Sequence, residues 1–164
     1  MLILGLDPGL ARLGWGLLQY DGVRMGAVDY GVLTTEAHTD LPTRLVQLYE
    51  GVTDLIKRYE PDQIALEELF FAKNVTTAIS VGEARGITLL ACRQATNQLY
   101  EYTPMQIKQA LVGYGKAEKQ QIQQMVKLLL RLDEIPKPDD AADGLAIAIC
   151  HANTARMHHQ FRIQ

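Results

Sequence analysis

Four carboxylates stand beside strongly apolar segments of this chain: Asp7, Glu67, Asp140 and Asp143. Such side chains are costly to desolvate, and where several come together a divalent cation is the usual compensation. Because the ligands would all be oxygen atoms, Mg²⁺ or Mn²⁺ is favoured over zinc. Two ions about 4 Å apart would activate a water molecule and stabilise the leaving oxygen of an in-line displacement at phosphorus. The acids therefore indicate a metal-dependent phosphoryl-transfer enzyme.

Each acid also has a structural explanation when it is taken alone. Asp7 precedes a Pro-Gly pair and could be a turn residue, and Glu67 could be an exposed strand end. Asp139 or Asp140 could cap the last helix, and we predict this role for Asp139. These explanations leave Asp143 unaccounted for, because it stands within AADGLAIAI, where the pattern otherwise prefers small and apolar residues. A shared metal site is therefore the better interpretation of the four acids.

The choice between the neighbouring acids Glu67 and Glu68 depends on strand register. Consecutive side chains of a strand project to opposite faces, so only one of the two can face the site. We assign the ligand to Glu67, because it directly ends the apolar run QIALE, and expect Glu68 to be solvated. A register slip of one residue would exchange them.

Hydrophobic periodicity and turn residues predict the elements that must position the acids. Three β-rich runs form a meander at the start of the chain, and QIALE and QLYEY add a fourth and a fifth strand. The predicted helices cover residues 41–59, about 76–97, 103–132 with two glycines inside it, and about 139–156. The expected order is βββαβαβαα.

This order predicts an α/β fold with a five-stranded mixed sheet and helices on both faces. The first strand, 2–7, and the fourth, 63–67, could lie side by side and parallel, which would bring Asp7 and Glu67 together at the carboxyl ends of their strands. Asp140 and Asp143 are three residues apart, so they share one face near the start of the last helix and can point at this sheet edge.

Length and composition limit the class of protein. A chain of 164 residues with 48% hydrophobic residues fits one compact domain, which we assign to residues 1–157, followed by a flexible tail at 158–164. We see no secretory signal and no run of about 18 apolar residues, so we expect a soluble, cytoplasmic protein that does not enter a membrane. Cys92 and Cys150 lie in apolar helical patterns and are predicted to be buried free thiols. With a net charge of −3, nucleic-acid binding must come from local basic patches.

Five segments together resemble the RuvC-type Holliday junction resolvases: LGLDPGLARLGWGLL, ALEELFFAKN, GEARG, VGYGKAEKQQIQQMV and DDAADGLAIAI. The resemblance spans nearly the whole chain and implies a single ribonuclease H-like nuclease domain. It also implies a homodimer that brings two active sites to a four-way DNA junction and nicks two strands of like polarity, leaving 5′-phosphate ends. Two Mg²⁺ ions per subunit, with Mn²⁺ as a substitute, and the RuvA and RuvB branch-migration proteins as partners follow from the same resemblance.

The resemblance places the family's four acidic ligands on the four acids chosen above, and its basic residues near the scissile phosphate on Lys108 and Lys119. A lysine that flanks a two-metal site can hold a phosphate and offset charge that develops in the transition state. Lys116, beside the glycine-rich GYG turn, is a further candidate for a phosphate contact. Solvated helix faces are the structural alternative for these lysines.

The family's aromatic residue at the loop facing the junction falls on Phe70. Phe70 and Phe71 are consecutive, so in an extended segment one ring enters the core and the other can stack on an unpaired base. We assign the outward ring to Phe70, although both rings could instead close the end of the sheet. Lys73 and Asn74 are candidates for contacts with the DNA backbone.

Two other classes of protein remain open at this stage. An actin-like or sugar-kinase-like nucleotide-binding domain has a first hairpin similar to LGLDPGLARLGWG, but it repeats the fold in two lobes and this chain offers one copy. A non-catalytic junction-binding module, or an RNA-processing nuclease of the same fold, is the second, because a fold does not fix a substrate. The four intact acids argue against an inert binder.

Overall fold

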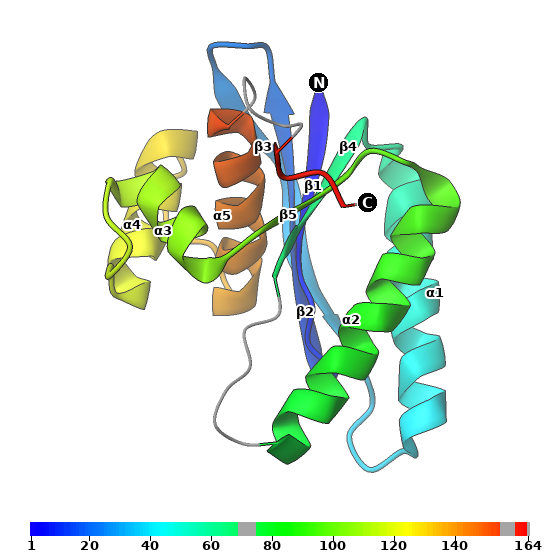
Figure 1. Cartoon of the computed structure of the whole chain (residues 1–164). Coiled ribbons are helices and arrows are strands. Elements are labelled where there is room, and N and C mark those ends of the chain that lie inside the picture. The colour runs from blue at the N-terminus through cyan, green and yellow to red at the C-terminus, as the bar shows by residue number, and fades with distance from the viewer. Residues whose placement is uncertain (69–74, 155–159, 164) are drawn as a thin grey trace.

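The computed structural model describes residues 1–68, 75–154 and 160–163, and its centre is one five-stranded mixed sheet (Figure 1). The strands lie in the order β3-β2-β1-β4-β5, and their bounds are β1 Leu2–Asp7, β2 Arg12–Tyr20, β3 Met25–Thr34, β4 Gln63–Glu67 and β5 Leu99–Tyr102. The first three strands form the predicted antiparallel meander, and β4 lies parallel to both β1 and β5. The prediction that the first and fourth strands are parallel neighbours is confirmed.

Helices cover both faces of the sheet, as the sequence predicts. Helices α1 (Leu41–Tyr59) and α2 (Val75–Ala95) lie on one face, and α3 (Pro104–Val112), α4 (Lys119–Leu130) and α5 (Asp139–Asn153) lie on the other (Figure 1). Two clusters of buried side chains result, one on each side of the sheet. Strand alternation assigns side chains to them: Leu4 and Leu6 face α1 and α2, whereas Ile3 faces α5.

The helical segment from 103 to 132 is two helices and not one continuous element. Thr103 caps α3 through a reciprocal capping box with Gln106, and Pro104 occupies the first turn, as expected. Gly113, with φ of 84°, ends α3 in a left-handed conformation that removes the next residues from the hydrogen-bond ladder. Gly113, which was predicted to lie inside one helical segment, is therefore a helix end, and α4 begins only at Lys119.

The boundaries of α5 correct two further expectations. Pro138 is the residue before the helix, with extended backbone angles, so Asp139 is the first helical residue and the prediction that it is the N-cap is wrong. Its charge still lies in the first turn, where the helix dipole favours an acid. The helix ends at Asn153, before residue 156, and the Thr154 hydroxyl and backbone N–H both donate to the carbonyl of Cys150 at this end.

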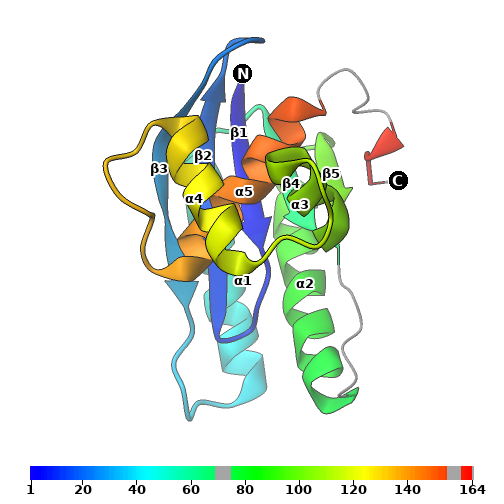
Figure 2. The same ribbon diagram turned by 90° about the vertical axis from the view of Figure 1, so that its left-hand side faces the viewer.

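Glycines allow α5 to lie directly on β1 and β2 (Figure 2). A Cβ atom at Gly16 would lie 2.5 Å from the backbone nitrogen of Leu145, and one at Gly144 would lie 2.4 Å from the carbonyl carbon of Trp15. A Cβ at Gly14 would lie 1.9 Å from the carbonyl oxygen of Asp140. Because no other residue fits at these positions, the start of α5 is fixed against the carboxyl end of β1.

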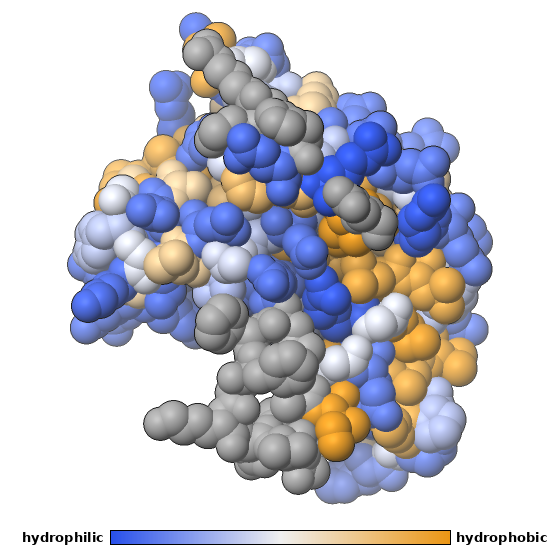
Figure 3. Space-filling view, in the orientation of Figure 1, coloured by the Kyte–Doolittle hydropathy of each residue, from blue (hydrophilic) through white to orange (hydrophobic). Residues whose placement is uncertain are grey.

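Cys92 and Cys150 are buried free thiols, as predicted. Residues 161–163 hydrogen-bond along the edge of β5, and the predicted division into a domain of residues 1–157 and a tail stays a prediction. None of the helices in the described part of the chain is long and apolar enough to span a membrane. Apolar side chains gather over α2 at the surface (Figure 3), and Ile79 and Leu90 of this helix are 59% and 49% exposed.

Candidate active site

Strand pairing brings Asp7 and Glu67 together. Leu6 of β1 pairs with Leu66 of β4 in the parallel ladder, so the following residues are neighbours at the carboxyl ends of the two strands. Both acids lie on the face covered by α5, because Ala65, two residues before Glu67, packs into the cluster on that side. Their carboxyl groups are hydrogen-bonded to each other.

The environment of this pair opposes ionisation of both acids. Burial, together with the nearby charges of Asp143 and Asp140, raises the pKa of Asp7 above its ordinary value. Burial and the charge of Asp7 raise the pKa of Glu67 to about 8. Two carboxyl groups in contact share one proton more readily than they both ionise. The protein alone thus leaves negative charge at this edge of the sheet incompletely compensated.

Asp143 joins the pair from the first turns of α5. Its position follows from the glycine contacts, which press the start of this helix against β1 and β2. Burial raises the pKa of Asp143, and a charged hydrogen bond from Lys119 partly offsets that effect. Lys119 Nζ lies 3.1 Å from Asp143 Oδ2 and 3.8 Å from Asp139 Oδ2. Burial alone would lower the pKa of Lys119, but these acids raise it above its ordinary value.

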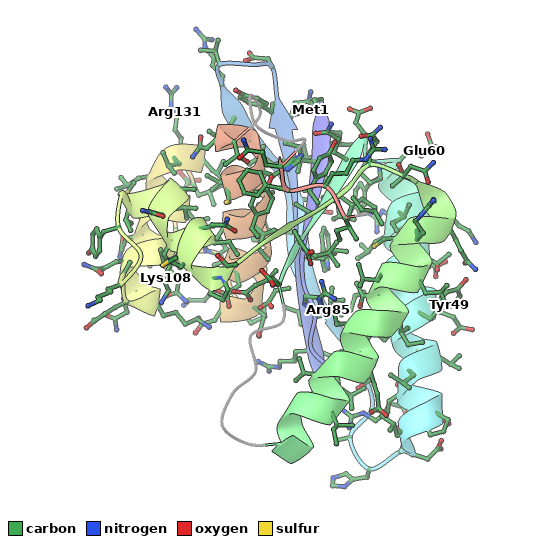
Figure 4. All side chains as sticks on the ribbon, viewed as in Figure 1. Met1, Tyr49, Glu60, Arg85, Lys108 and Arg131 are labelled. Atoms are coloured by element: carbon green, nitrogen blue, oxygen red, sulfur yellow. The ribbon has the colours of Figure 1, made fainter. Side chains whose placement is uncertain are left out.

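A cavity of about 330 Å³ opens between the sheet edge and helices α3, α4 and α5. Its polar walls are Asp7, Glu67, Asp143, Lys108 and Lys119. The remaining lining side chains come mainly from α3 and α5 and are apolar, so water is limited on that side. The structure therefore brings together three of the four predicted acids and both lysines that the resemblance selected. Figure 4 labels Lys108, which extends from α3.

Asp140 is the fourth predicted ligand, and it differs from the other three. Asp140 is not among the described residues that line the cavity. Its Oδ2 atom accepts a hydrogen bond from Arg12 Nη1 at 3.2 Å. Its charge still contributes to the raised pKa of Asp7, so the two carboxylates are near each other. Asp140 thus stands at the margin of the site and already has a positive partner.

Several other predicted residues lie away from the cavity or outside the described part of the chain. Lys116 is exposed in the turn between α3 and α4 and is not among the residues that line this cavity. Phe70, Lys73 and Asn74 fall in the segment 69–74, outside the described residues. Their predicted DNA contacts therefore stay predictions.

Two arginines near the acids were missed by the sequence analysis. Arg12 could have been found from alternation, because it shares a face of β2 with Gly14 and Gly16. Arg85 lies within the quoted GEARG segment and projects from α2 (Figure 4), and its guanidinium pairs with Glu101 of β5. It lines a second cavity of about 200 Å³, on the α2 side, that shares Asp7 and Glu67 as walls.

The donor set fits a hard divalent cation. All four predicted ligands are carboxylates, and three are half-buried with raised pKa values, so a cation would relieve their mutual repulsion and desolvation. Among the described residues, however, no three acidic, histidine or cysteine side chains already stand in a metal-binding arrangement. The side chains would therefore have to converge when the ion binds.

Comparison with known proteins agrees with this chemistry. A family model described as Crossover junction endodeoxyribonuclease RuvC matches residues 3–151. The chain is 55% identical over 157 residues to the protein of that name from Caldanaerobacter subterraneus subsp. tengcongensis, which covers 96% of this chain and 95% of the relative. It is 59% identical over 152 residues to the one from Desulforamulus reducens, or 93% of each chain.

Solved structures give the same result at the level of the fold. The RuvC of Thermus thermophilus, solved in complex with Holliday junction substrate, superposes with a TM-score of 0.91 at 36% identity, over 99% of this chain and 98% of that chain. The yeast mitochondrial Holliday junction resolvase Ydc2 superposes with a TM-score of 0.64 at 15% identity, over 96% of this chain and 82% of that chain, and so shares the fold alone. The five-stranded mixed sheet is the ribonuclease H-like fold, and the chain belongs to the RuvC family of crossover junction endodeoxyribonucleases.

Proposed function

We propose that the chain resolves four-way DNA junctions by metal-dependent, paired nicks, with the acidic cavity as its active site. The observation that carries the proposal is one cavity that places three half-buried carboxylates near two lysines, at the edge of the sheet where the parallel strands β1 and β4 end. This is the edge at which α/β sheets bind ligands. The Thermus thermophilus relative with Holliday junction substrate supports the choice of DNA.

The four acids Asp7, Glu67, Asp140 and Asp143 would hold two Mg²⁺ ions per subunit, and Mn²⁺ would substitute. When bound, such ions supply an activated water and stabilise the oxygen that leaves the phosphorus. The chain's own contribution is to hold the carboxylates within reach of one another. The apolar side chains on one wall of the cavity lower the local dielectric and so strengthen the electrostatic interactions of the charged groups beside them.

The lysines serve the substrate. Lys108 and Lys119 lie on the wall opposite Asp7 and Glu67, where their ammonium groups can bind non-bridging phosphate oxygens and offset charge in the transition state. In the free protein Lys119 is paired with Asp143. This pair would be replaced when a phosphate binds to Lys119 and an ion binds to Asp143. The products would carry 5′-phosphate and 3′-hydroxyl ends.

Contacts with the rest of the junction belong to the surface around the cavity. Phe70 would stack on an unpaired base, and Lys73, Asn74 and Lys116 would contact the phosphate backbone. Each lysine contact with a phosphate contributes affinity that falls as salt increases.

A homodimer would bring two such sites to one junction. The surface of α2 supports this proposal, because its exposed Ile79 and Leu90 form part of an apolar area (Figure 3). RuvA and RuvB would deliver the junction to the dimer. The two buried free thiols suit a reducing cytoplasm.

The test incubates the wild-type protein and Asp7→Asn with a labelled mobile four-way junction, a linear duplex and an RNA-DNA hybrid, in Mg²⁺ or in EDTA. Paired, ligatable nicks at symmetric positions, absent with Asp7→Asn and with EDTA, are the expected result. Junction binding without nicking would favour the non-catalytic module, and cleavage of the hybrid alone would favour the RNA-processing nuclease. Binding of ATP and of no nucleic acid would favour the nucleotide-binding alternative.

A further inference from the structure

The proposed reaction gives no role to the ion pair between Arg12 and Asp140. Arg12 Nη1 lies 3.2 Å from Asp140 Oδ2, and the two side chains belong to β2 and α5, 128 residues apart in sequence. A metal ligand that accepts from a guanidinium has one oxygen engaged before any ion arrives. The pair therefore competes directly with metal binding.

The fold fixes where this contact occurs. Arg12 shares a face of β2 with Gly14, and a Cβ at Gly14 would lie 1.9 Å from the carbonyl oxygen of Asp140. Arg12 is also held by pairing with Thr34 of β3, and Gly14 is the partner of Asp7 in the ladder between β1 and β2. The backbones of Asp140, Arg12 and Asp7 thus have fixed relative positions, and only the side-chain ends are free to change partners.

Asp140 differs from the other three acids in its position relative to the cavity. Asp7, Glu67 and Asp143 line the cavity, whereas Asp140 is not among the described residues that line it. The described residues also hold no preformed group of three metal ligands. The position of Asp140 outside the cavity lining follows if this carboxylate is drawn toward the start of β2 by its guanidinium partner.

We infer that Arg12 is a positioning residue that holds Asp140 apart from the other three carboxylates until a divalent cation displaces it. The inference rests on the proposed metal site. The guanidinium of Arg12 and the divalent cation would then compete for the carboxylate of Asp140. Lys119 differs from Arg12 because it lines the cavity and pairs with Asp143, where it can also reach substrate.

The exposure of the pair makes this exchange feasible. The Arg12 side chain is 60% exposed and that of Asp140 is 26% exposed, so their attraction is screened by water and salt. Exposed pairs of this kind shift an equilibrium by about two- to five-fold. A cation that gains four carboxylate ligands can displace such a partner, whereas a fully buried pair would prevent binding.

The experiment measures Mn²⁺ affinity by titration calorimetry in the absence of DNA, on the full chain. Arg12→Gln should bind Mn²⁺ about two- to five-fold more tightly than the wild type, and the gain should shrink as salt is raised. Arg12→Lys, which can re-form the pair, should stay near the wild-type value. Arg24→Gln is the matched control, because it removes the same charge from the hairpin at the other end of β2.

A double-mutant cycle separates contact from distant charge. In an Asp140→Asn background, Arg12→Gln should leave the Mn²⁺ affinity unchanged, since its partner is already neutral. An equal gain in both backgrounds, or no gain in the wild-type background, would overturn the inference while leaving the metal site intact. Failure of the proposed function would be distinct: the wild type would then show no Mn²⁺ binding that Asp7→Asn removes.

Discussion

Two groups of partly or fully buried polar side chains lie on the α5 face of the sheet, at opposite ends of α5. At the carboxyl end of α5, Thr154 donates to the Tyr102 hydroxyl, which lies 2.7 Å from His151 Nδ1, and Gln63 Oε1 lies 2.7 Å from His151 Nε2. At the amino end of α5, carboxyl groups face one another and their pKa values are raised.

The two groups differ in whether protein atoms alone satisfy their hydrogen bonds and offset their charges. A neutral imidazole offers one donor and one acceptor, so the His151 group is complete with protein atoms alone and needs no ligand. The acidic group brings carboxyl groups against one another, and burial and repulsion raise their pKa values despite the nearby lysines. Burial of polar side chains is thus common to both ends, whereas opposed like charge distinguishes the end at which we propose that a cation and a substrate bind.

The largest expected effect is on catalysis at the acidic end. Asp7→Asn removes a proposed metal ligand, so cleavage of a labelled junction in Mg²⁺ should fall by about 10³-fold or more. Binding of the same junction in EDTA should be retained or slightly tightened, because negative charge near the phosphates is lost. Gel-based cleavage rates and binding isotherms measure the two quantities, and an equal loss of both would contradict the assignment.

The next largest effect is on the packing of α5, the helix that carries side chains of both ends. In Gly16→Val the new side chain meets the backbone of Leu145, with its Cβ 2.5 Å from the nitrogen, so α5 must move away from β2. We expect the free energy of unfolding to fall by about 3 kcal/mol in urea titrations. Gly26→Val is the control, because a Cβ at Gly26 meets no atom within 4 Å, and its effect should stay within about 1 kcal/mol.

A smaller effect distinguishes the His151 end. His151→Phe keeps much of the packing but leaves Tyr102 and Gln63 short of a partner, which should cost about 2 kcal/mol in urea unfolding. Cleavage by the folded fraction should remain within about two-fold of the wild type, because no group of the acidic end is changed. A catalytic loss as large as that of Asp7→Asn would end the distinction between the two ends.

The smallest effect is the pH dependence of the metal-free protein. Glu67 has its pKa raised to about 8 in the folded chain, so the folded state holds a proton that the unfolded state has released. Its contribution to stability is full below the ordinary value of 4.5 and is lost as the pH rises toward 8. Urea unfolding in EDTA at several pH values should show this decline, on the order of 1–2 kcal/mol, and Glu67→Gln should reduce it.

Local patterns were sufficient to predict the sheet. Alternation of apolar residues in LILGLD and QIALE, with turn residues between elements, identified strands that pair as expected and carry Asp7 and Glu67 to one edge. The spacing of Asp143 within an apolar helix identified a residue that packing alone does not require. These predictions succeeded because they depend on residues that are close in sequence or on the general rule for parallel strands.

Other features depend on contacts that a single segment cannot reveal. The pairing of Arg12 with Asp140 requires the register of β2 and the closeness of α5, which rests on Gly14 and Gly144 together. Helix α3 ends at Gly113 because that glycine adopts a positive φ. The sequence did not predict this end, because the helical periodicity continues on both sides of the glycine. Asp139 was misassigned as a cap because Pro138, just before it, takes the extended conformation instead.

We propose that the acidic end is incomplete without a cation, and a comparison of unfolding free energies tests this claim. Urea unfolding of the wild type and Glu67→Gln at pH 8 would be measured in EDTA and in excess Mg²⁺. We predict that Glu67→Gln is the more stable protein in EDTA, because it lacks a buried charge, and that Mg²⁺ stabilises the wild type more than the variant. A wild type that is more stable than Glu67→Gln in EDTA, with no further gain from Mg²⁺, would contradict the claim.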